Sequence, residues 1–156
     1  MSRPAVEIRE IQPGDYEQLL ADIRPADLAE AEALAGPGAL PGLLKETLAG
    51  SAMSWAMAAP DGVVCLFGVA PQSLMGDTGL PWMVGTTRVV RERRALMRLA
   101  PAYIQRMLAA FPTLVNVVDA RNLRSIRFLR HLGFTILAPV AVGAAGMPFH
   151  PFVKEA

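Results

Sequence analysis

The segment from residue 114 to residue 134 constrains the fold more than any other part of this 156-residue chain. Residues 114–119 are a short apolar run, LVNVVD, and Asn122 stands where the next helix would begin. An Asn side chain caps a helix well because its oxygen accepts a hydrogen bond from a backbone N–H in the first turn. Residues 122–132 then predict a helix, which Gly133 ends because glycine tolerates the left-handed conformation. A buried strand followed by a helix indicates an α/β chain.

The N-terminal third is predicted to be mainly helical after one opening strand. Val6, Ile8 and Ile11, separated by charged residues, predict that strand. Pro13, Gly14 and Asp15 open the first helix, and two further helices follow, each bounded by Pro or Gly. The three expected helical stretches are residues 15–23, 25–34 and 40–48.

The middle of the chain predicts a hairpin, a third strand and a long helix. Residues 53–58 and 63–70 flank the turn Ala-Pro-Asp-Gly, in which Pro fixes φ and Gly accepts positive φ. Residues 82–90 predict another strand. Apolar residues at helical spacing over 91–111 predict a long helix. Pro101 either kinks this helix or marks a later start for it. Residues 135–142 and 149–153 are expected as closing strands.

Length and composition indicate one soluble domain spanning residues 1–156. No run of about 18 uninterrupted apolar residues appears, so no membrane span is expected. The opening residues carry charges where an export signal needs an apolar stretch, so we expect a cytoplasmic location. Cys65 is the only cysteine, lies in the apolar run VVCLFGV, and is predicted to be a core residue.

Charge is segregated along the chain. Residues 1–80 hold 11 Asp and Glu against 4 Lys and Arg, whereas residues 81–156 hold 3 against 11. The two halves either pair with each other, or remain solvated faces, or leave the C-terminal half to face an anion. Four arginines beside Asn122 recur at three-residue spacing and spread over about half of a helix: Arg121, Arg124, Arg127 and Arg130. No nucleic-acid motif accompanies them, so any contact with nucleic acid would be weak and independent of sequence.

The order of the elements, together with the segment VNVVDARNLRSIRFLRHLGF, resembles the GCN5-related N-acetyltransferases (GNAT). Asn122, Ser125, Gly133 and Phe134 match the family's helix-opening Asn, the small residue after it and the closing Gly-Phe. The resemblance implies an α+β fold with a mixed, mostly antiparallel sheet of six or seven strands flanked by helices. It also implies that an active member would use acetyl-CoA.

Four stretches resemble a narrower group, bacteriophage internal virion proteins with this same fold. They are IRPADLAEAEAL, PWMVGTTRV, FPTLVN and RNLRSIRFLRHLGF. This second resemblance implies a structural or accessory role in virion assembly or DNA ejection, with other phage structural proteins or a second copy of the chain as partners. It also implies residence in a bacterial host, and in the virion if the protein is packaged.

Acetyltransferases of this family hold pyrophosphate in a glycine-rich loop before the long helix, where backbone N–H groups and the helix dipole meet the phosphates. Here the sequence TTRVVRERRALMRLA contains no glycine. Five arginines of this stretch either contact an anion through their side chains or form an ordinary solvated helix end: Arg88, Arg91, Arg93, Arg94 and Arg98.

The family's proton-transfer groups are also missing. The position of the usual acid Tyr is Leu129, and residues 82–90 contain no carboxylate to serve as a base. His131 and Tyr103 are available but have no motif behind them, and His131 is expected on a helix surface. We therefore predict no catalytic residue.

Two hypotheses follow from the sequence. In the first, the protein is a noncatalytic phage or prophage component that needs no cofactor and no metal. In the second, it is an active acetyl-CoA-dependent N-acetyltransferase of a primary amine, with cofactor contacts at Met83, Val84, Gly85, Arg93, Arg94 and Asn122. An opening between the Trp82 strand and the Leu114 strand distinguishes them, because bulky side chains such as Trp82 and Met83 would fill it in a noncatalytic protein.

Overall fold

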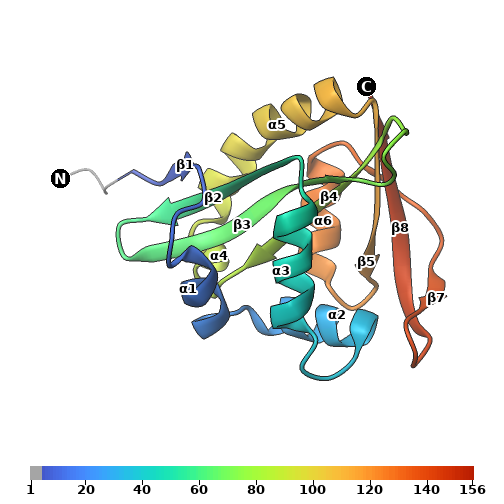
Figure 1. Ribbon diagram of the computed structural model, residues 1–156, viewed down its shortest axis with the longest axis horizontal. Helices are drawn as coiled ribbons and strands as arrows, with labels where there is room; N and C mark the ends of the chain where they lie inside the picture. Colours follow the sequence, from blue (N-terminus) through green and yellow to red (C-terminus); the bar gives the residue numbers. More distant parts are fainter. Residues whose placement is uncertain (1–4) are drawn as a thin grey trace.

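One sheet of eight strands organises residues 5–156, the part of the chain that the computed structural model describes (Figure 1). The strands follow the order β1-β2-β3-β4-β5-β8-β6, and β7 pairs with β8 beside this path. Among the strand pairs of the described residues, β4–β5 alone is parallel. The strands are β1 Glu7–Arg9, β2 Met53–Ala59, β3 Gly62–Pro71, β4 Thr78–Gly85, β5 Thr113–Asp119, β6 Thr135–Ile136, β7 Val140–Val142 and β8 Met147–Glu155.

Helices cover both faces of this sheet. Leu19 of α1 and Leu44 of α3 pack against Ala56 and Leu66 on one face, while α5 and α6 pack on the other against a core that includes Cys65. Successive residues of a strand point to opposite faces, which is why neighbours in β3 enter different cores. The helices are α1 Asp15–Ala21, α2 Pro25–Ala35, α3 Leu40–Gly50, α4 Arg88–Arg91, α5 Arg93–Ala110 and α6 Leu123–His131.

The expected fold class is confirmed, although the sheet of residues 5–156 has eight strands where six or seven were expected. Residues 135–142 were expected as one strand, but they form the short strands β6 and β7. Pro139 lies between the two, and a proline cannot donate the N–H that a continuous ladder requires. None of the helices in residues 5–156 has the length and apolar character needed to cross a lipid bilayer.

The prediction of a strand over residues 82–90 is wrong at both ends. Strand β4 starts at Thr78 and stops at Gly85, and Val89 and Val90 lie in the separate helix α4. The buried Thr86 makes the break: its Oγ1 donates to Val63 O at 2.8 Å and accepts from Arg88 N at 3.2 Å. A hydroxyl that bonds to the backbone in this way ends a strand and starts a helical turn.

Pro101 lies inside α5, which runs through it without a late start. Proline lacks an N–H, so the carbonyl of Met97, four residues earlier, loses its helical donor. His131 Nε2 lies 3.0 Å from that carbonyl oxygen and must donate to it, because a carbonyl only accepts. His131, which the sequence indicated as a plain surface residue, therefore joins the end of α6 to α5.

Candidate functional site

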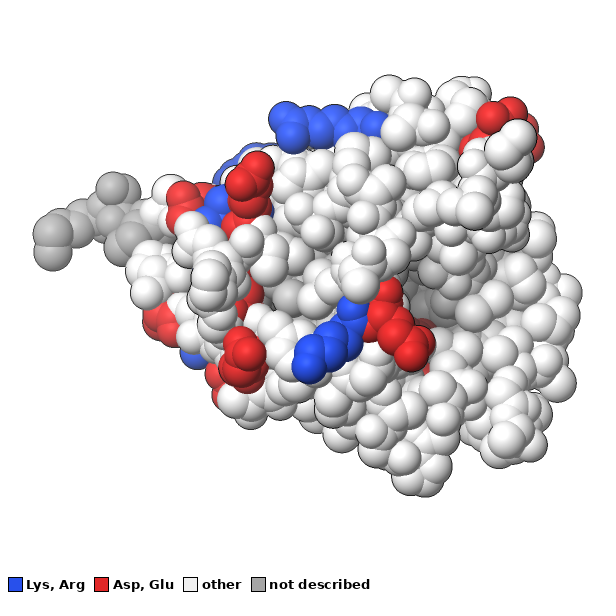
Figure 2. Space-filling model, in the orientation of Figure 1, with Lys and Arg blue, Asp and Glu red and all other residues white. Residues whose placement is uncertain are grey.

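The parallel strands β4 and β5 separate soon after they pair. They are hydrogen-bonded neighbours only at Thr78 with Thr113 and Gly79 with Leu114. Beyond these positions a cavity of about 470 Å³ lies at the gap, lined by residues from both strands and from the helices on both faces of the sheet. On the face covered by α2 and α3, Figure 2 shows a hollow with acidic side chains beside it. The opening that distinguishes the two hypotheses is therefore present.

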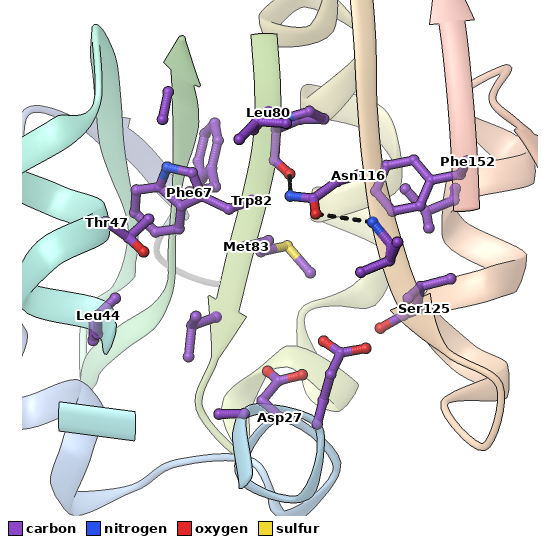
Figure 3. Close-up of a pocket in the computed structure, with 18 of the residues that line it drawn as sticks. Asp27, Leu44, Thr47, Phe67, Leu80, Trp82, Met83, Asn116, Ser125 and Phe152 are labelled. Carbon is purple, nitrogen blue, oxygen red and sulfur yellow. Dashed lines mark hydrogen bonds between the residues drawn. The ribbon is translucent and has the colours of Figure 1, made fainter. Parts of the chain in front are cut away.

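Bulky side chains do not close this opening. Trp82 turns toward the end of α3, where its Nε1 donates to Ser51 Oγ at 2.8 Å, and its ring packs in the core around Leu19 and Leu44. Met83 lines the cavity beside it (Figure 3). Trp82 and Met83 are bulky enough to fill the gap, but both line the cavity without closing it, and the indole of Trp82 leans toward α3 as part of the cavity wall.

Peptide groups of β4 form one edge of the gap. Alternation along an antiparallel strand sends the N–H and C=O of every second residue to the same side. The carbonyl of Pro81 and the N–H of Gly85 bond across the gap, to Asn116 Nδ2 at 2.9 Å and to Asp27 Oδ2 at 2.7 Å. Met83 lies between these two residues, so its peptide groups face the gap as well.

The β5 edge is capped by side chains. Asn116 bridges the gap: besides its bond to Pro81, its Oδ1 accepts from Val117 N at 2.8 Å (Figure 3). Further along, Asp119 N donates to Glu30 Oε1 of α2 at 2.6 Å. Several of the backbone groups that an extended ligand would use between the strands are therefore occupied by the protein's own side chains.

Asp27 and Arg24 form a buried ion pair at the end of the gap. Arg24 Nη2 lies 2.6 Å from Asp27 Oδ1 and also donates to Ser125 Oγ at 3.0 Å and to Asn122 Oδ1 at 3.4 Å. The exposed fractions of Arg24 and Asp27 are 7% and 6%. The pair thus ties the start of α2 both to the end of β4 and to the first turn of α6.

Glu30, one helical turn after Asp27, presents the second carboxyl group of α2 to the cavity. The pKa of Glu30 is raised to about 7, mainly by burial and also by the charges of Asp27 and Asp119. The N–H of Asp119 and the guanidinium of Arg24 oppose this rise. Near neutral pH this carboxyl group exists in both protonation states. A group with this property, facing a cavity, is suited to accept and release a proton.

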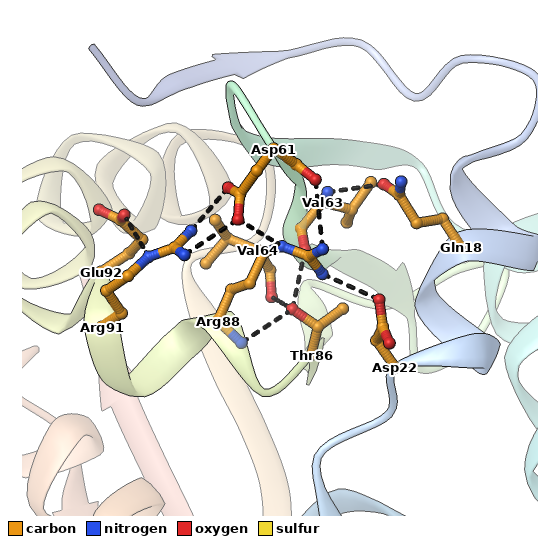
Figure 4. Close-up of polar contacts among 9 residues, drawn as sticks. All are labelled: Gln18, Asp22, Asp61, Val63, Val64, Thr86, Arg88, Arg91 and Glu92. Carbon is orange, nitrogen blue, oxygen red and sulfur yellow. Dashed lines mark hydrogen bonds and ion pairs between the residues drawn. The ribbon is translucent and has the colours of Figure 1, made fainter. Parts of the chain in front are cut away.

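The region between β4 and α5, where a glycine-rich loop would hold pyrophosphate, is held together by ion pairs. Arg88 donates a hydrogen bond to the carboxylate of Asp22 at 3.0 Å, and Arg91 donates two to the carboxylate of Asp61 at 2.9 and 2.7 Å (Figure 4). The hydrogen bonds from Arg91 lower the pKa of Asp61 to about 2. Arg88 and Arg91 therefore serve the structure, contrary to the interpretation that they are available to an anion.

Three other arginines of the same stretch remain available. Arg93, Arg94 and Arg98 are exposed on the first turns of α5, and none of them makes an ion pair within residues 5–156. They share a shallow polar concavity with the residues around them. Glu92, which precedes the helix, is 4% exposed and accepts from Arg91 Nε at 3.1 Å. Any phosphate bound here would be held by arginine side chains.

The remaining predicted positions divide between the cavity and the core. Val84 and Leu129 line the cavity. Leu129 stands where the family has its acid tyrosine, and a leucine cannot donate a proton there. Asn122 caps α6 by accepting from Ser125 N at 3.4 Å and does not line the cavity. Tyr103 packs edge-on against Trp55, with ring centroids 4.9 Å apart.

Cys65 is fully buried, and that burial raises the pKa of its thiol to about 12, so it is no nucleophile. Glu30 is the residue that the sequence reasoning missed. Its signal was the i, i+3 spacing with Asp27, which places both carboxylates on one side of α2.

Comparison with solved structures defines the class of fold. The chain is similar over its full length to acetyltransferases of the GNAT family, and it has the GNAT fold. An acetyltransferase of this family from Streptococcus pneumoniae aligns with a TM-score of 0.70 at 15% identity, covering 97% of this chain and 100% of that one. A ribosomal-protein-alanine N-acetyltransferase from Brucella melitensis aligns with a TM-score of 0.70 at 16% identity, covering 96% and 99%.

A third similar structure contains CoA and spermine. The spermidine N-acetyltransferase from Vibrio cholerae, in complex with CoA and spermine, aligns with a TM-score of 0.69 at 7% identity, covering 96% of this chain and 95% of that one. No family model matches the sequence, and no curated protein matches it. These findings establish the acetyltransferase fold and give no support to the narrower phage group.

Proposed function

We propose that this protein is an N-acetyltransferase that moves the acetyl group of acetyl-CoA to an amine, with Glu30 as the base. The observation that carries the proposal is the cavity at the β4–β5 gap, into which a carboxyl group with a pKa of about 7 faces. Enzymes of this fold in the comparisons are acetyltransferases, and one of them was solved with CoA and an amine. Fold similarity alone does not assign an activity, so the site carries the argument.

The residues present fit acetyl-CoA in two places. The peptide groups of Met83 face the gap and suit the amide groups of the pantetheine arm, while Arg93 and Arg94 at the start of α5 suit its phosphates. Without a glycine loop, phosphate binding relies on side chains. Bound acetyl-CoA would supply the acetyl group as a thioester.

The chain's own contribution is proton handling and orientation. An amine reaching the cavity as an ammonium ion loses one proton to the Glu30 carboxylate and becomes nucleophilic. A nitrogen–carbon bond then forms as the carbon–sulfur bond breaks, and the second proton of the amine leaves with sulfur as the CoA thiol. Leu129 offers no acid for that last proton, so solvent carries it. Deprotonated Glu30 is required, so the rate is expected to rise as pH increases through about 7.

The test is acetyl transfer by the purified protein, followed as CoA release with a thiol reagent across pH 5.5–9. Wild type is expected to transfer acetyl groups with a rising pH profile, and Glu30→Gln is expected to lower kcat by about 10²–10³-fold and flatten that profile. Glutamine keeps an oxygen for the N–H of Asp119, so the variant should fold. Stabilisation by CoA in a thermal-shift assay should survive the change. Absence of any shift at millimolar acetyl-CoA, or a pH profile that the variant leaves intact, would refute the proposal.

A noncatalytic binding module is the second candidate function. It is favoured by the occupied groups at the gap, where Asn116, Asp27 and Glu30 bond to the strand edges, and by α4 standing in place of a phosphate loop. A role in a phage particle, which the sequence resemblance implies, would fall under this candidate. The same thermal-shift measurement separates the two, because a module of this kind has no reason to bind acetyl-CoA.

A further inference from the structure

The charged groups that line the cavity are all of one sign. Asp27, Glu30 and Glu46 contribute carboxyl groups, and no Lys, Arg or His is among the lining residues that the structure describes. Asp27 is already paired with Arg24, whereas Glu30 and Glu46 make no ion pair within residues 5–156. A ligand carboxylate here would lose its hydration without gaining a counter-ion, which is strongly unfavourable.

The wall on the α2–α3 side of the cavity is apolar. Leu34 of α2, Leu40, Leu43 and Leu44 of α3, and Trp82 of β4 line it. Thr47 adds a hydroxyl, and the exposed Glu46 lies on the same helix (Figure 3 shows Leu44, Thr47 and Trp82). Arg93 and Arg94, which fit the donor, lie on α5 across the sheet, so this side is left for the acceptor. An acceptor buried against this wall gains free energy from an alkyl or aromatic body.

We propose that the acceptor is a monocationic alkyl- or arylalkylamine that carries no carboxylate, an inference that rests on the proposed function. Its ammonium group meets Glu30, and its apolar body lies against the leucines of α2 and α3. An α-amino acid is excluded because its carboxylate, attached to the carbon that bears the amine, would be held beside Glu30 and Asp27. A polyamine is disfavoured because Glu46 can meet only one further cationic group, and the rest of its chain would place charge and not alkyl or aromatic surface against the leucine side chains.

The experiment compares three amines that isolate these features. Phenethylamine and phenylalanine differ only in the carboxylate, and spermidine replaces the aromatic body with further cations. Binding is measured by NMR chemical-shift perturbation on the protein alone, and kcat/KM is measured with acetyl-CoA. The kcat/KM for phenethylamine is expected to be at least about 100-fold higher than that for phenylalanine. It is also expected to be at least about tenfold higher than that for spermidine.

A cationic side chain introduced into the wall tests whether the acidic lining causes the preference for an amine without a carboxylate. Thr47→Arg places a guanidinium where the lining has none, and it is expected to reduce the preference for phenethylamine over phenylalanine by at least about tenfold. Thr47→Gln is the matched control, since it adds bulk without charge and should leave the preference unchanged. If both variants change the preference for phenethylamine over phenylalanine equally, the acidic lining is not the cause of that preference and the inference fails.

The outcomes separate this inference from the proposed function. If phenethylamine shifts the resonances of Leu44 and Thr47 but no amine is acetylated, the proposed function fails and the ligand class stands. If acetyl transfer occurs but phenylalanine or spermidine is the better substrate, the proposed function stands and the ligand class is overturned. If none of the three amines binds or reacts, the ligand class is overturned as well.

Discussion

Asn116 is the residue that would compete most directly with the proposed ligand in the gap. Its amide bridges from the carbonyl of Pro81 on β4 to the N–H of Val117 on its own strand, at 2.9 and 2.8 Å. An extended ligand inserted between these strands would use the same groups. The side chain therefore satisfies these edge groups in the free protein, and the proposed ligand would have to displace it.

Asn116→Ala is expected to strengthen binding of CoA by about three- to tenfold and to lower the free energy of unfolding by about 1 kcal/mol. The first effect follows because Pro81 O no longer has a protein donor, and the second because two partly buried backbone groups lose a partner. Isothermal titration with CoA and urea unfolding measure the two. Weaker binding by the alanine variant would mean that Asn116 contacts the ligand instead of competing with it.

At the scale of elements, the arginines around α4 and α5 divide into two sets. Arg88 and Arg91 hold α4 to the β2–β3 turn through Asp61, whereas Arg93 and Arg94 on the first turn of α5 are exposed and unpaired within residues 5–156. Clustered positive charge at a helix N-terminus is repelled by the positive end of the helix dipole and destabilises the helix. The second set therefore matches a ligand anion better than a structural role.

The double variant Arg93→Gln and Arg94→Gln is expected to raise the Kd for acetyl-CoA at least tenfold while changing the free energy of unfolding by less than about 0.5 kcal/mol. The loss should shrink at high salt, because exposed charges are screened. Arg106→Gln, on the same helix but near its far end, is the matched control. An equal effect of the control on Kd would show that general charge, and not the start of α5, governs binding.

Local sequence signals predicted most of these elements. The Pro-Asp-Gly turn located the hairpin, and Asn122 with Gly133 bounded α6, because turn and cap residues act through the backbone beside them. The end of β4 was missed because Thr86 stops the strand through bonds to β3, which are distant in sequence. Glu30 was missed for the same reason: a carboxylate on a helix reads as a solvated surface until the ends of β4 and β5 are brought to it.

At the scale of the whole molecule, the acidic and basic halves of the sequence are joined by specific contacts. Arg88 pairs with Asp22, and Arg91 pairs with Asp61. Uncharged groups add to these contacts, because the backbone N–H of Asp119 donates to Glu30. The segregation of charge that the sequence shows therefore reflects, in part, pairing between the halves. The cavity lies between these halves, so the contacts that hold α2 against β4, β5 and α6 also set its shape.

The buried pair Arg24–Asp27 lies within the acidic half and bonds to Ser125 and Gly85 of the other half, and it makes the last prediction. Asp27→Ala is expected to cost about 3–5 kcal/mol in free energy of unfolding, because it leaves the guanidinium of Arg24 buried without a counter-charge and the N–H of Gly85 without an acceptor. Arg24→Met alone should cost about as much, since it strands the carboxylate.

The double variant is the informative one, because it removes both charges at once. If burial of an uncompensated charge is the main cost, Arg24→Met with Asp27→Ala should be at least about 2 kcal/mol less destabilising than the sum of the single changes. Urea unfolding of the four proteins at one pH measures this coupling. Additive losses would mean that each side chain stabilises its own surroundings independently and that α2 is held by packing. A clear coupling would mean that Arg24 and Asp27 act as one unit at the start of the helix that carries Glu30, so that loss of either partner also disturbs the bonds of this unit to Ser125 and Gly85.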